Sequence, residues 1–158
     1  MSCAAQLIEK AIQSGLIITT AESCTGGMVA AALTDIPGSS AAFERGFITY
    51  SNSAKVEMLG VTQASLKAFG AVSEQVAAEM ATGALAHSKA QLAVSITGIA
   101  GPGGSEHKPE GRVCFALADA SGVIVKETVE FSALGRDNVR IAARDHALAR
   151  LLDVLQNR

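Results

Sequence analysis

The sequence contains few aromatic residues. Among its 158 residues aromatics make up 4%, with no tryptophan and a single tyrosine. Hydrophobic residues nevertheless make up 49% and the mean hydropathy is +0.30, which excludes an intrinsically disordered chain. The core must therefore be built mainly from alanine, valine, leucine and isoleucine. We expect one domain over residues 1–158, because a chain of this length buries roughly 70% of its unfolded surface.

Cysteine and histidine are also scarce. Cys3, Cys24 and Cys114 form no CxxC pair, and the count is odd, which argues against a disulfide framework and a cysteine-based zinc site. His87 and His146 fall on predicted helices without ligand spacing between them. We therefore expect neither a metal nor a cofactor.

Neither sign of charge dominates, and long apolar runs are missing. The 13 basic and 15 acidic residues give a net charge of −2, which creates no global field for nucleic acid or an anionic membrane. No apolar stretch approaches the ~18 residues of a membrane span, and residues 1–15 lack the apolar region of a secretory signal. We expect a cytoplasmic protein with no nucleic-acid partner and no membrane partner.

What the chain does contain is a regular alternation of apolar patterns. These predict helices at 4–14, 26–34, 53–59, 62–69, 73–87 and 137–156, and strands at 16–21, 43–50, 91–97, 113–118 and 123–131. The last two strands read as a hairpin, and residues 113–118 as buried on both faces. This order predicts a single-domain layered α/β fold with a mixed sheet flanked by helices.

Local details follow from the same patterns. We expect Asp137 to cap the last helix. Ile12 and Ile141 are expected on the buried faces of the first and last helices. Ligands of such sheets bind beyond the carboxyl ends of the strands, where two glycine-rich corners fall.

The first corner is TTAESCTGG, residues 19–27, where a buried strand meets a helix. Unpaired N–H groups at a helix start can hold a phosphate or an oxyanion, and adjacent glycines let a substrate approach the backbone. A hydroxyl at this corner could be a nucleophile. Alternatively, Ser23 or Thr25 merely caps the helix, and this stretch alone does not decide between the two.

The second stretch is FERGFITYSNSAK, residues 43–55, which ends on Lys55 near a predicted helix start. Burial and the positive helix end would both lower the pKa of this lysine, as a neutral lysine base requires. The alternative is a solvated surface lysine, with Ser53 as the helix cap.

The third stretch is SITGIAGPGGSEHKPEG, residues 95–111, most of which reads as a long loop. Loops of this length in a compact domain usually carry function or are disordered, and we favour function. His107 within it could be a base or a ligand, or could simply be exposed to solvent. Arg136 and Arg140 follow on successive turns of the last helix and could hold a phosphate or be ordinary solvated residues.

Together these stretches resemble the CinA C-terminal domain family. The resemblance rests on TAESCTGG, FERGFITYSNSAK, GAVSEQV, and SITGIAGPGG with SEHKPEG, and it spans about residues 19–140. The characterised activity of the family is nicotinamide-nucleotide amidase. The resemblance therefore implies that nicotinamide mononucleotide (NMN) is deamidated to nicotinate mononucleotide and ammonia in pyridine nucleotide recycling, by a Ser-Lys type of site without a cofactor.

Carried over by motif, the resemblance implies Ser23 as nucleophile and Lys55 as base, with Tyr50 as a third catalytic residue. The residues expected to bind the substrate are Cys24, Thr25, Gly26, Gly27, Thr97, Gly98, Gly101, Gly103 and Arg140. Cys24 is also a rival nucleophile, because a thiol at a helix N-terminus can have a lowered pKa. We expect a small-molecule nucleotide as the substrate and a homo-oligomer as the assembly.

The chain departs from the family pattern at two places. The loop ends KPEGRV rather than KPVGTV, which introduces Glu110 and Arg112, and LGR stands in place of GDR before the last helix. These changes affect the expected substrate contacts near Arg112 and Arg136. Two alternatives therefore remain: a non-catalytic nucleotide-binding or regulatory module, and an amidase for a different amide.

Overall fold

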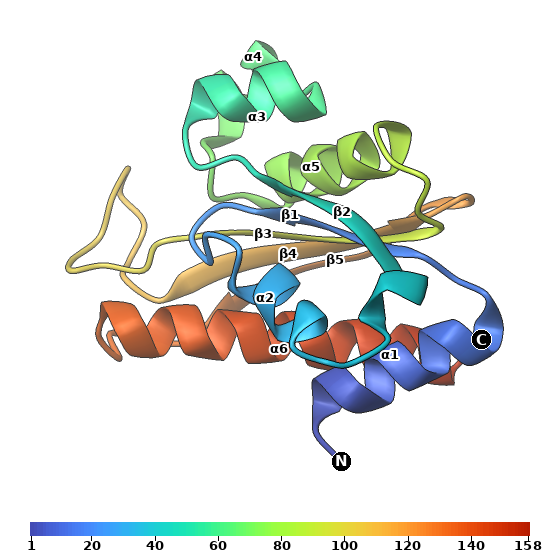
Figure 1. The fold of residues 1–158 in the computed structure, drawn as a ribbon. Helices are drawn as coiled ribbons and strands as arrows, with labels where there is room; N and C mark the ends of the chain where they lie inside the picture. The colour runs from blue at the N-terminus through green and yellow to red at the C-terminus, as the bar shows by residue number, and fades with distance from the viewer.

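A five-stranded sheet forms the middle layer of the domain in the computed structural model, which describes residues 1–158 (Figure 1). The spatial order is β2-β1-β3-β4-β5, with β1 Ile18–Glu22, β2 Phe43–Ile48, β3 Leu92–Gly98, β4 Arg112–Asp119 and β5 Gly122–Glu130. β1 pairs in parallel with β2 and β3, whereas the β3–β4 and β4–β5 pairs are antiparallel. The predicted mixed sheet and its terminal hairpin are confirmed.

Helices cover both faces of this sheet. On one face lie α1 Cys3–Ser14, α2 Met28–Thr34 and α6 Arg136–Gln156, and on the other α3 Asn52–Leu59, α4 Gln63–Phe69 and α5 Glu74–Ala86 (Figure 1). A short 3-10 helix, Ser39–Ala41, precedes β2. The layered α/β architecture expected from the sequence is therefore present.

Two apolar clusters fill the two spaces between sheet and helices. β4 contributes to both: Phe115 and Leu117 pack in the α1/α6 cluster, while Ala116 and Ala118 pack in the α5 cluster. The strand is therefore buried on both faces, as its continuous apolar pattern predicts. Small side chains on the α5 side let that helix approach the sheet closely.

Three local predictions are wrong. Gly135, not Asp137, is the N-cap of α6, and no side chain caps that helix. Ile141 is 40% exposed because the buried stripe of α6 runs through Val139 and Ala143 at four-residue spacing, which places Ile141 on another face. Ile12 is 44% exposed, since α1 buries a narrow stripe that ends at Ala11.

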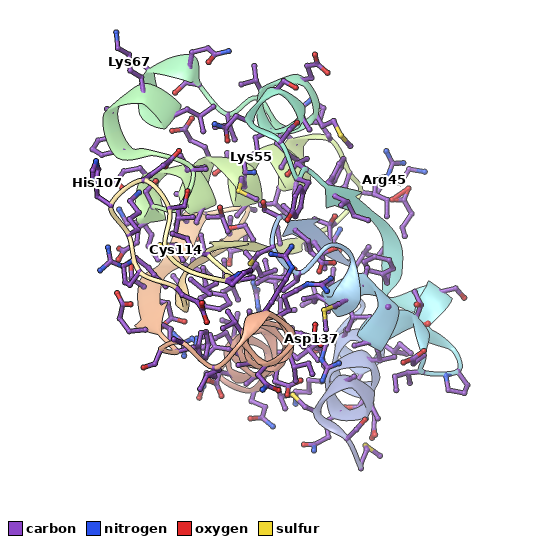
Figure 2. All side chains as sticks on the ribbon, turned by 90° about the vertical axis from the view of Figure 1, so that its left-hand side faces the viewer. Arg45, Lys55, Lys67, His107, Cys114 and Asp137 are labelled. Carbon is purple, nitrogen blue, oxygen red and sulfur yellow. The ribbon has the colours of Figure 1, made fainter.

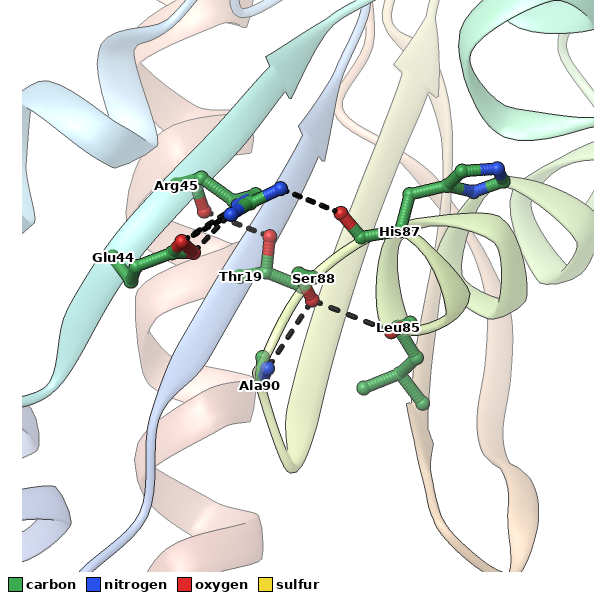
Figure 3. A network of polar contacts seen from close by, with 7 residues as sticks. All are labelled: Thr19, Glu44, Arg45, Leu85, His87, Ser88 and Ala90. Carbon is green, nitrogen blue, oxygen red and sulfur yellow. Dashed lines mark hydrogen bonds and ion pairs between the residues drawn. The ribbon is translucent and has the colours of Figure 1, made fainter.

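At the amino end of the parallel strands, a polar network fixes the edge strand β2 (Figure 3). The Arg45 guanidinium donates to the Glu44 carboxylate and to the carbonyl of His87 at the end of α5 (3.1 Å). Oγ1 of Thr19 donates to the carbonyl of Arg45 at 2.8 Å. β2 is thus tied to β1 and α5, and its charged edge disfavours pairing with another strand.

Candidate active site

Three polar segments meet beyond the carboxyl ends of β1, β2 and β3. Because these strands are parallel neighbours, their ends lie at one edge of the sheet. A cavity of about 370 Å³ opens there, within the usual size range of small-molecule sites. The sequence-predicted residues that line it are Ser23, Cys24, Tyr50, Lys55, Thr97, Gly98, Gly101 and Gly103.

The amine of Lys55 lies against the hydroxyl of Ser23 at the base of this cavity. Nζ is 3.0 Å from Oγ, and Lys55 and Ser23 are 1% and 8% exposed. Nζ also donates to the carbonyls of Thr49 at 2.9 Å and Tyr50 at 3.2 Å. Figure 2 shows Lys55 in the interior, whereas Lys67 lies at the periphery. The structure thus joins two residues 32 positions apart.

Two features of its surroundings shift the protonation equilibrium of Lys55 toward the neutral amine. Burial lowers the pKa of the amine below its ordinary value, an effect that a thiolate at Cys24 would partly offset. Lys55 is the fourth residue of α3, so the positive end of the helix also disfavours an ammonium. A neutral amine has two N–H donors and one lone pair. In the structure Nζ donates to Oγ of Ser23 as well as to the two carbonyls. After loss of one proton, the two remaining N–H groups can bond the carbonyls and the lone pair can accept the hydroxyl proton of Ser23.

The alternative of a solvated lysine behind a Ser53 cap is wrong. The N-cap of α3 is Ser51, whose Oγ accepts from the N–H of Ala54 at 3.0 Å. This cap starts the helix one residue earlier than the sequence suggested. Lys55 is the fourth residue of this helix and is buried rather than solvated.

Glu22, and neither Ser23 nor Thr25, satisfies the start of α2. Its buried carboxylate accepts from the N–H groups of Gly27 (3.2 Å), Val29 (2.9 Å) and Ala30 (3.0 Å), and from Oγ1 of Thr25 (2.7 Å). A carboxylate at a helix N-terminus also complements the helix dipole. Glu22 therefore caps α2, and the Ser23 hydroxyl is free of that role and can bond Lys55.

The backbone of the same corner has one N–H, that of Cys24, that bonds no oxygen in the protein and belongs to a residue lining the cavity. The N–H of Ser23 donates to the carbonyl of Ile96, and that of Gly26 donates to the carbonyl of Ser23. Neither the N–H of Cys24 nor that of Thr25 donates to a backbone carbonyl or a side-chain oxygen. Because Cys24 lines the cavity, its N–H could hold an oxyanion that forms next to Ser23.

The Cys24 thiol is not activated, contrary to the expectation for a thiol near a helix start. Burial raises its pKa to about 12, and the negative charge of Glu22 adds to this, while a hydrogen bond from the backbone N–H of Cys24 itself, Arg140 and Lys55 act in the opposite direction. The side chain is 6% exposed and contributes to the apolar cluster. At neutral pH the sulfur is therefore a thiol, which is a poor nucleophile.

Four predicted binding residues do not line the cavity. Thr25 and the glycines Gly26 and Gly27 lie behind the corner, and both glycines have positive φ angles of 58° and 106°, so α2 begins only at Met28. Arg140 donates from Nε to the carbonyl of Cys24 at 3.0 Å. Arg140 thus stabilises the backbone at Cys24 from the side away from the cavity.

Arg136, which the sequence left open as a phosphate ligand, also lines the cavity, together with residues that the sequence did not single out: Asn52, Ala71, Val72, Ile99, Ala100, Pro102, Gly104, Ser105 and Glu106. Ala71 and Val72 come from the α4–α5 connection, where Oγ1 of Thr97 donates to the carbonyl of Ala71 at 2.9 Å. Arg136 spans the mouth, donating to the carbonyl of Gly101 (2.6 Å) and the hydroxyl of Tyr50 (2.9 Å).

The remaining candidates lie elsewhere. His107 is exposed and absent from the cavity lining, and Figure 2 shows it at the periphery. Arg112 donates to Glu130 on the neighbouring strand at 2.6 Å, outside the cavity. No group of three or more His, Cys, Asp or Glu side chains is placed to hold a metal ion. No helix has the length and apolarity needed to cross a bilayer.

Comparisons with known proteins show which family the chain belongs to. The pattern of the CinA C-terminal domain matches residues 1–155. Nicotinamide-nucleotide amidohydrolase PncC of Escherichia coli (strain K12) is 57% identical over 138 residues, 87% of this chain and 83% of that protein.

Solved structures agree in fold over nearly the whole chain. The competence/damage inducible protein CihA from Agrobacterium tumefaciens superposes with a TM-score of 0.89 at 46% identity, covering 99% of this chain and 97% of that one. A CinA superfamily protein from Klebsiella pneumoniae 700603 gives 0.94 at 34% identity, with the same coverage of 99% and 97%. The chain therefore belongs to the CinA C-terminal domain family.

Proposed function

We propose that this protein is a nicotinamide-nucleotide amidohydrolase that converts NMN to nicotinate mononucleotide and ammonia. The observation that carries the proposal is the 3.0 Å contact between Oγ of Ser23 and Nζ of Lys55 inside the cavity. The relative from E. coli, at 57% identity, bears the name of this activity. The reaction returns the nucleotide to pyridine nucleotide recycling. We further propose a cytoplasmic location, in line with three free cysteines, and a homo-oligomeric assembly.

The proposed first half-reaction is acylation of Ser23. The neutral amine of Lys55 takes the hydroxyl proton as Oγ attacks the carboxamide carbon, and the carbonyl electrons move onto its oxygen. The N–H of Cys24, which donates to no oxygen of the protein, stabilises that oxyanion, and one such donor typically contributes ~3 kcal/mol. When the C–N bond breaks, the Lys55 ammonium gives its proton to the departing nitrogen, so that ammonia leaves.

The second half-reaction is hydrolysis of the resulting ester. Lys55, neutral again, takes a proton from a water molecule that attacks the acyl carbon. The C–O bond to Ser23 breaks, and Oγ recovers its proton from Lys55. The sum is one water consumed, with one carboxylic acid and one ammonia formed. Each step uses the same amine as base and then as acid, so the pair needs no further proton carrier.

The rest of the cavity suits a nucleotide. Arg136 and Lys55 are its only basic lining residues, and Lys55 is occupied at the base. Arg136 at the mouth is therefore the proposed partner of the phosphate, since a guanidinium binds phosphate in a bidentate way. The N–H groups of Gly101 and Gly104 make no hydrogen bond in the protein and offer further donors.

An ammonia-release assay over a panel of amides tests the proposal. The panel contains NMN, free nicotinamide, and simple aliphatic and aromatic amides, each offered to the wild type and to Ser23→Ala. We expect ammonia from NMN above all, and a loss on the order of 10⁴-fold or more in Ser23→Ala. NMN binding without ammonia would instead support a non-catalytic module, and ammonia from another amide alone would change the substrate.

A further inference from the structure

Glu110 lies outside the cavity but contacts two segments that shape it. Its Oε1 accepts from the N–H of Gly103 at 2.7 Å, and its Oε2 accepts from the N–H of Gly135 at 3.3 Å. Gly103 belongs to the loop that follows β3, and Gly135 immediately precedes α6. One carboxylate thus connects the cavity wall to the start of the helix that carries Arg136.

The wall segment depends on very few contacts. Residues 100–104 make only two hydrogen bonds in the protein, one from the N–H of Gly103 to Glu110 and one from Arg136 to the carbonyl of Gly101. Glu110 also packs directly against Gly101, where a Cβ atom would lie 2.5 Å from Oε1. Backbone bonding resumes at residue 105, and Ile99 is held by the backbone of residues 111 and 112.

These contacts form a closed circuit. The Glu110 carboxylate accepts from the N–H groups of Gly103 and Gly135. The next residue after Gly135, Arg136, donates to the carbonyl of Gly101 in the same wall segment as Gly103. Arg136 reaches from this circuit to the hydroxyl of Tyr50 across the mouth. If the carboxylate is lost, both the wall and Gly135, the N-cap of α6, lose an anchor, and the guanidinium of Arg136 is no longer held at one position.

We propose that Glu110 is a positioning residue for substrate binding, which fixes the glycine-rich wall and the Arg136 guanidinium at the cavity mouth. The inference rests on the proposed function, because it concerns binding of the same substrate. Glu110 forms no hydrogen bond with Ser23, which follows β1, or with Lys55, which lies in α3, at the base of the cavity. Its removal should therefore weaken binding and leave the chemical step unchanged.

The expected effect follows from the two hydrogen bonds. A carboxylate can accept from both N–H groups, whereas the glutamine amide has one acceptor oxygen and turns an NH₂ group toward the second N–H. Charge-assisted bonds of this partly exposed kind correspond to a roughly threefold to tenfold change in an equilibrium. We expect KM for NMN to rise about tenfold in Glu110→Ala and about threefold in Glu110→Gln.

The matched control is Glu79→Gln. Glu79 also accepts from a backbone N–H, that of Thr62 at 2.8 Å, but lies away from the cavity. The experiment measures kcat and KM for NMN in wild type and all three variants, together with amide hydrogen exchange at residues 99–105 and 132–136. We expect faster exchange in both segments and a higher KM in the Glu110 variants, with kcat within about twofold and the control unchanged in both readouts.

The outcomes separate this inference from the proposed function. If the wild type releases no ammonia from NMN, the proposed function fails, while the exchange data still test the anchoring. If the wild type is active and Glu110→Ala keeps its KM, or lowers kcat and KM together, the positioning role is refuted. Unchanged exchange at Gly103 in Glu110→Ala also refutes it, whatever the kinetics show.

Discussion

Lys55→Met removes the proposed base while leaving most of the side-chain volume in place. Methionine keeps an unbranched apolar stem that can fill the buried channel occupied by Lys55, which is 1% exposed. What disappears is the amine 3.0 Å from Oγ of Ser23 and its bonds to the carbonyls of Thr49 and Tyr50. The substitution therefore separates the loss of a proton acceptor from the loss of packing.

The magnitude follows from what else could take the proton. Lys55 is the only side chain that forms a hydrogen bond with Oγ of Ser23. The carboxylate of Glu22, the residue before Ser23, already accepts four hydrogen bonds from the α2 corner. A general base contributes about 10²–10⁴-fold, or roughly 3–5 kcal/mol of activation free energy. We expect the loss of kcat in Lys55→Met to be near 10⁴-fold, because no other side chain can take the proton.

The fold should survive this change. Two carbonyls lose a donor, at about 1 kcal/mol each, but a buried ionisable amine is removed at the same time. We expect the free energy of unfolding at pH 7 to change by less than about 2 kcal/mol.

Ammonia release at saturating NMN gives kcat for the variant, and urea unfolding followed by circular dichroism gives its stability. In the wild type, kcat should rise with pH through the lowered pKa of Lys55, because the neutral amine is the active form. The kcat of the variant should not show this rise with pH. A folded Lys55→Met protein that keeps more than about a tenth of wild-type kcat would refute the Ser-Lys mechanism.

Three further predictions concern the same corner of the molecule. Cys24→Ala should keep kcat within about threefold, because burial raises the pKa of that thiol to about 12 and leaves it protonated; a loss comparable to that of Ser23→Ala would make Cys24 the nucleophile. Glu22→Gln should lower the free energy of unfolding by about 1.5–3 kcal/mol in urea titrations, since a carboxylate that accepts from three N–H groups loses an acceptor; unchanged stability would contradict its capping role. The pKa of Lys55 is lower in the folded chain than its ordinary value of 10.5. At pH values between the lowered pKa and 10.5, the unfolded chain therefore binds more protons than the folded chain. Stability of the wild type relative to Lys55→Met should therefore rise with pH in that window, by up to about 1.4 kcal/mol per pH unit, and equal slopes would argue against a perturbed Lys55.

Much of the architecture could be predicted from apolar periodicity. The continuous pattern of β4 indicated a strand buried on both faces, and the alternation after Gly122 indicated a hairpin, as the structure confirms. The errors fall at helix ends and faces. Ile141 lies on an exposed face of α6 because the buried stripe depends on which side of the helix meets the sheet, and residue type alone does not fix that side.

The site divides in the same way. The clustering of Ser23 with Cys24, and of Tyr50 with Lys55, marked two polar strand ends along the chain. Only the parallel pairing of β1, β2 and β3 places those ends at one edge of the sheet and brings the two motifs together. The tertiary structure also assigned the cap to Glu22, buried the thiol of Cys24, and moved Arg140 behind the corner.

The sequence by itself determined the class of fold, the polar strand ends and the family resemblance, because these depend on local propensity, apolar periodicity and motif. The tertiary structure decided which of those residues share a cavity and which charges are desolvated. It also showed how Glu110 and Arg136 join the wall of the cavity to α6. Such contacts join residues up to 35 positions apart, and their geometry depends on the packing of whole strands and helices, which no local pattern encodes.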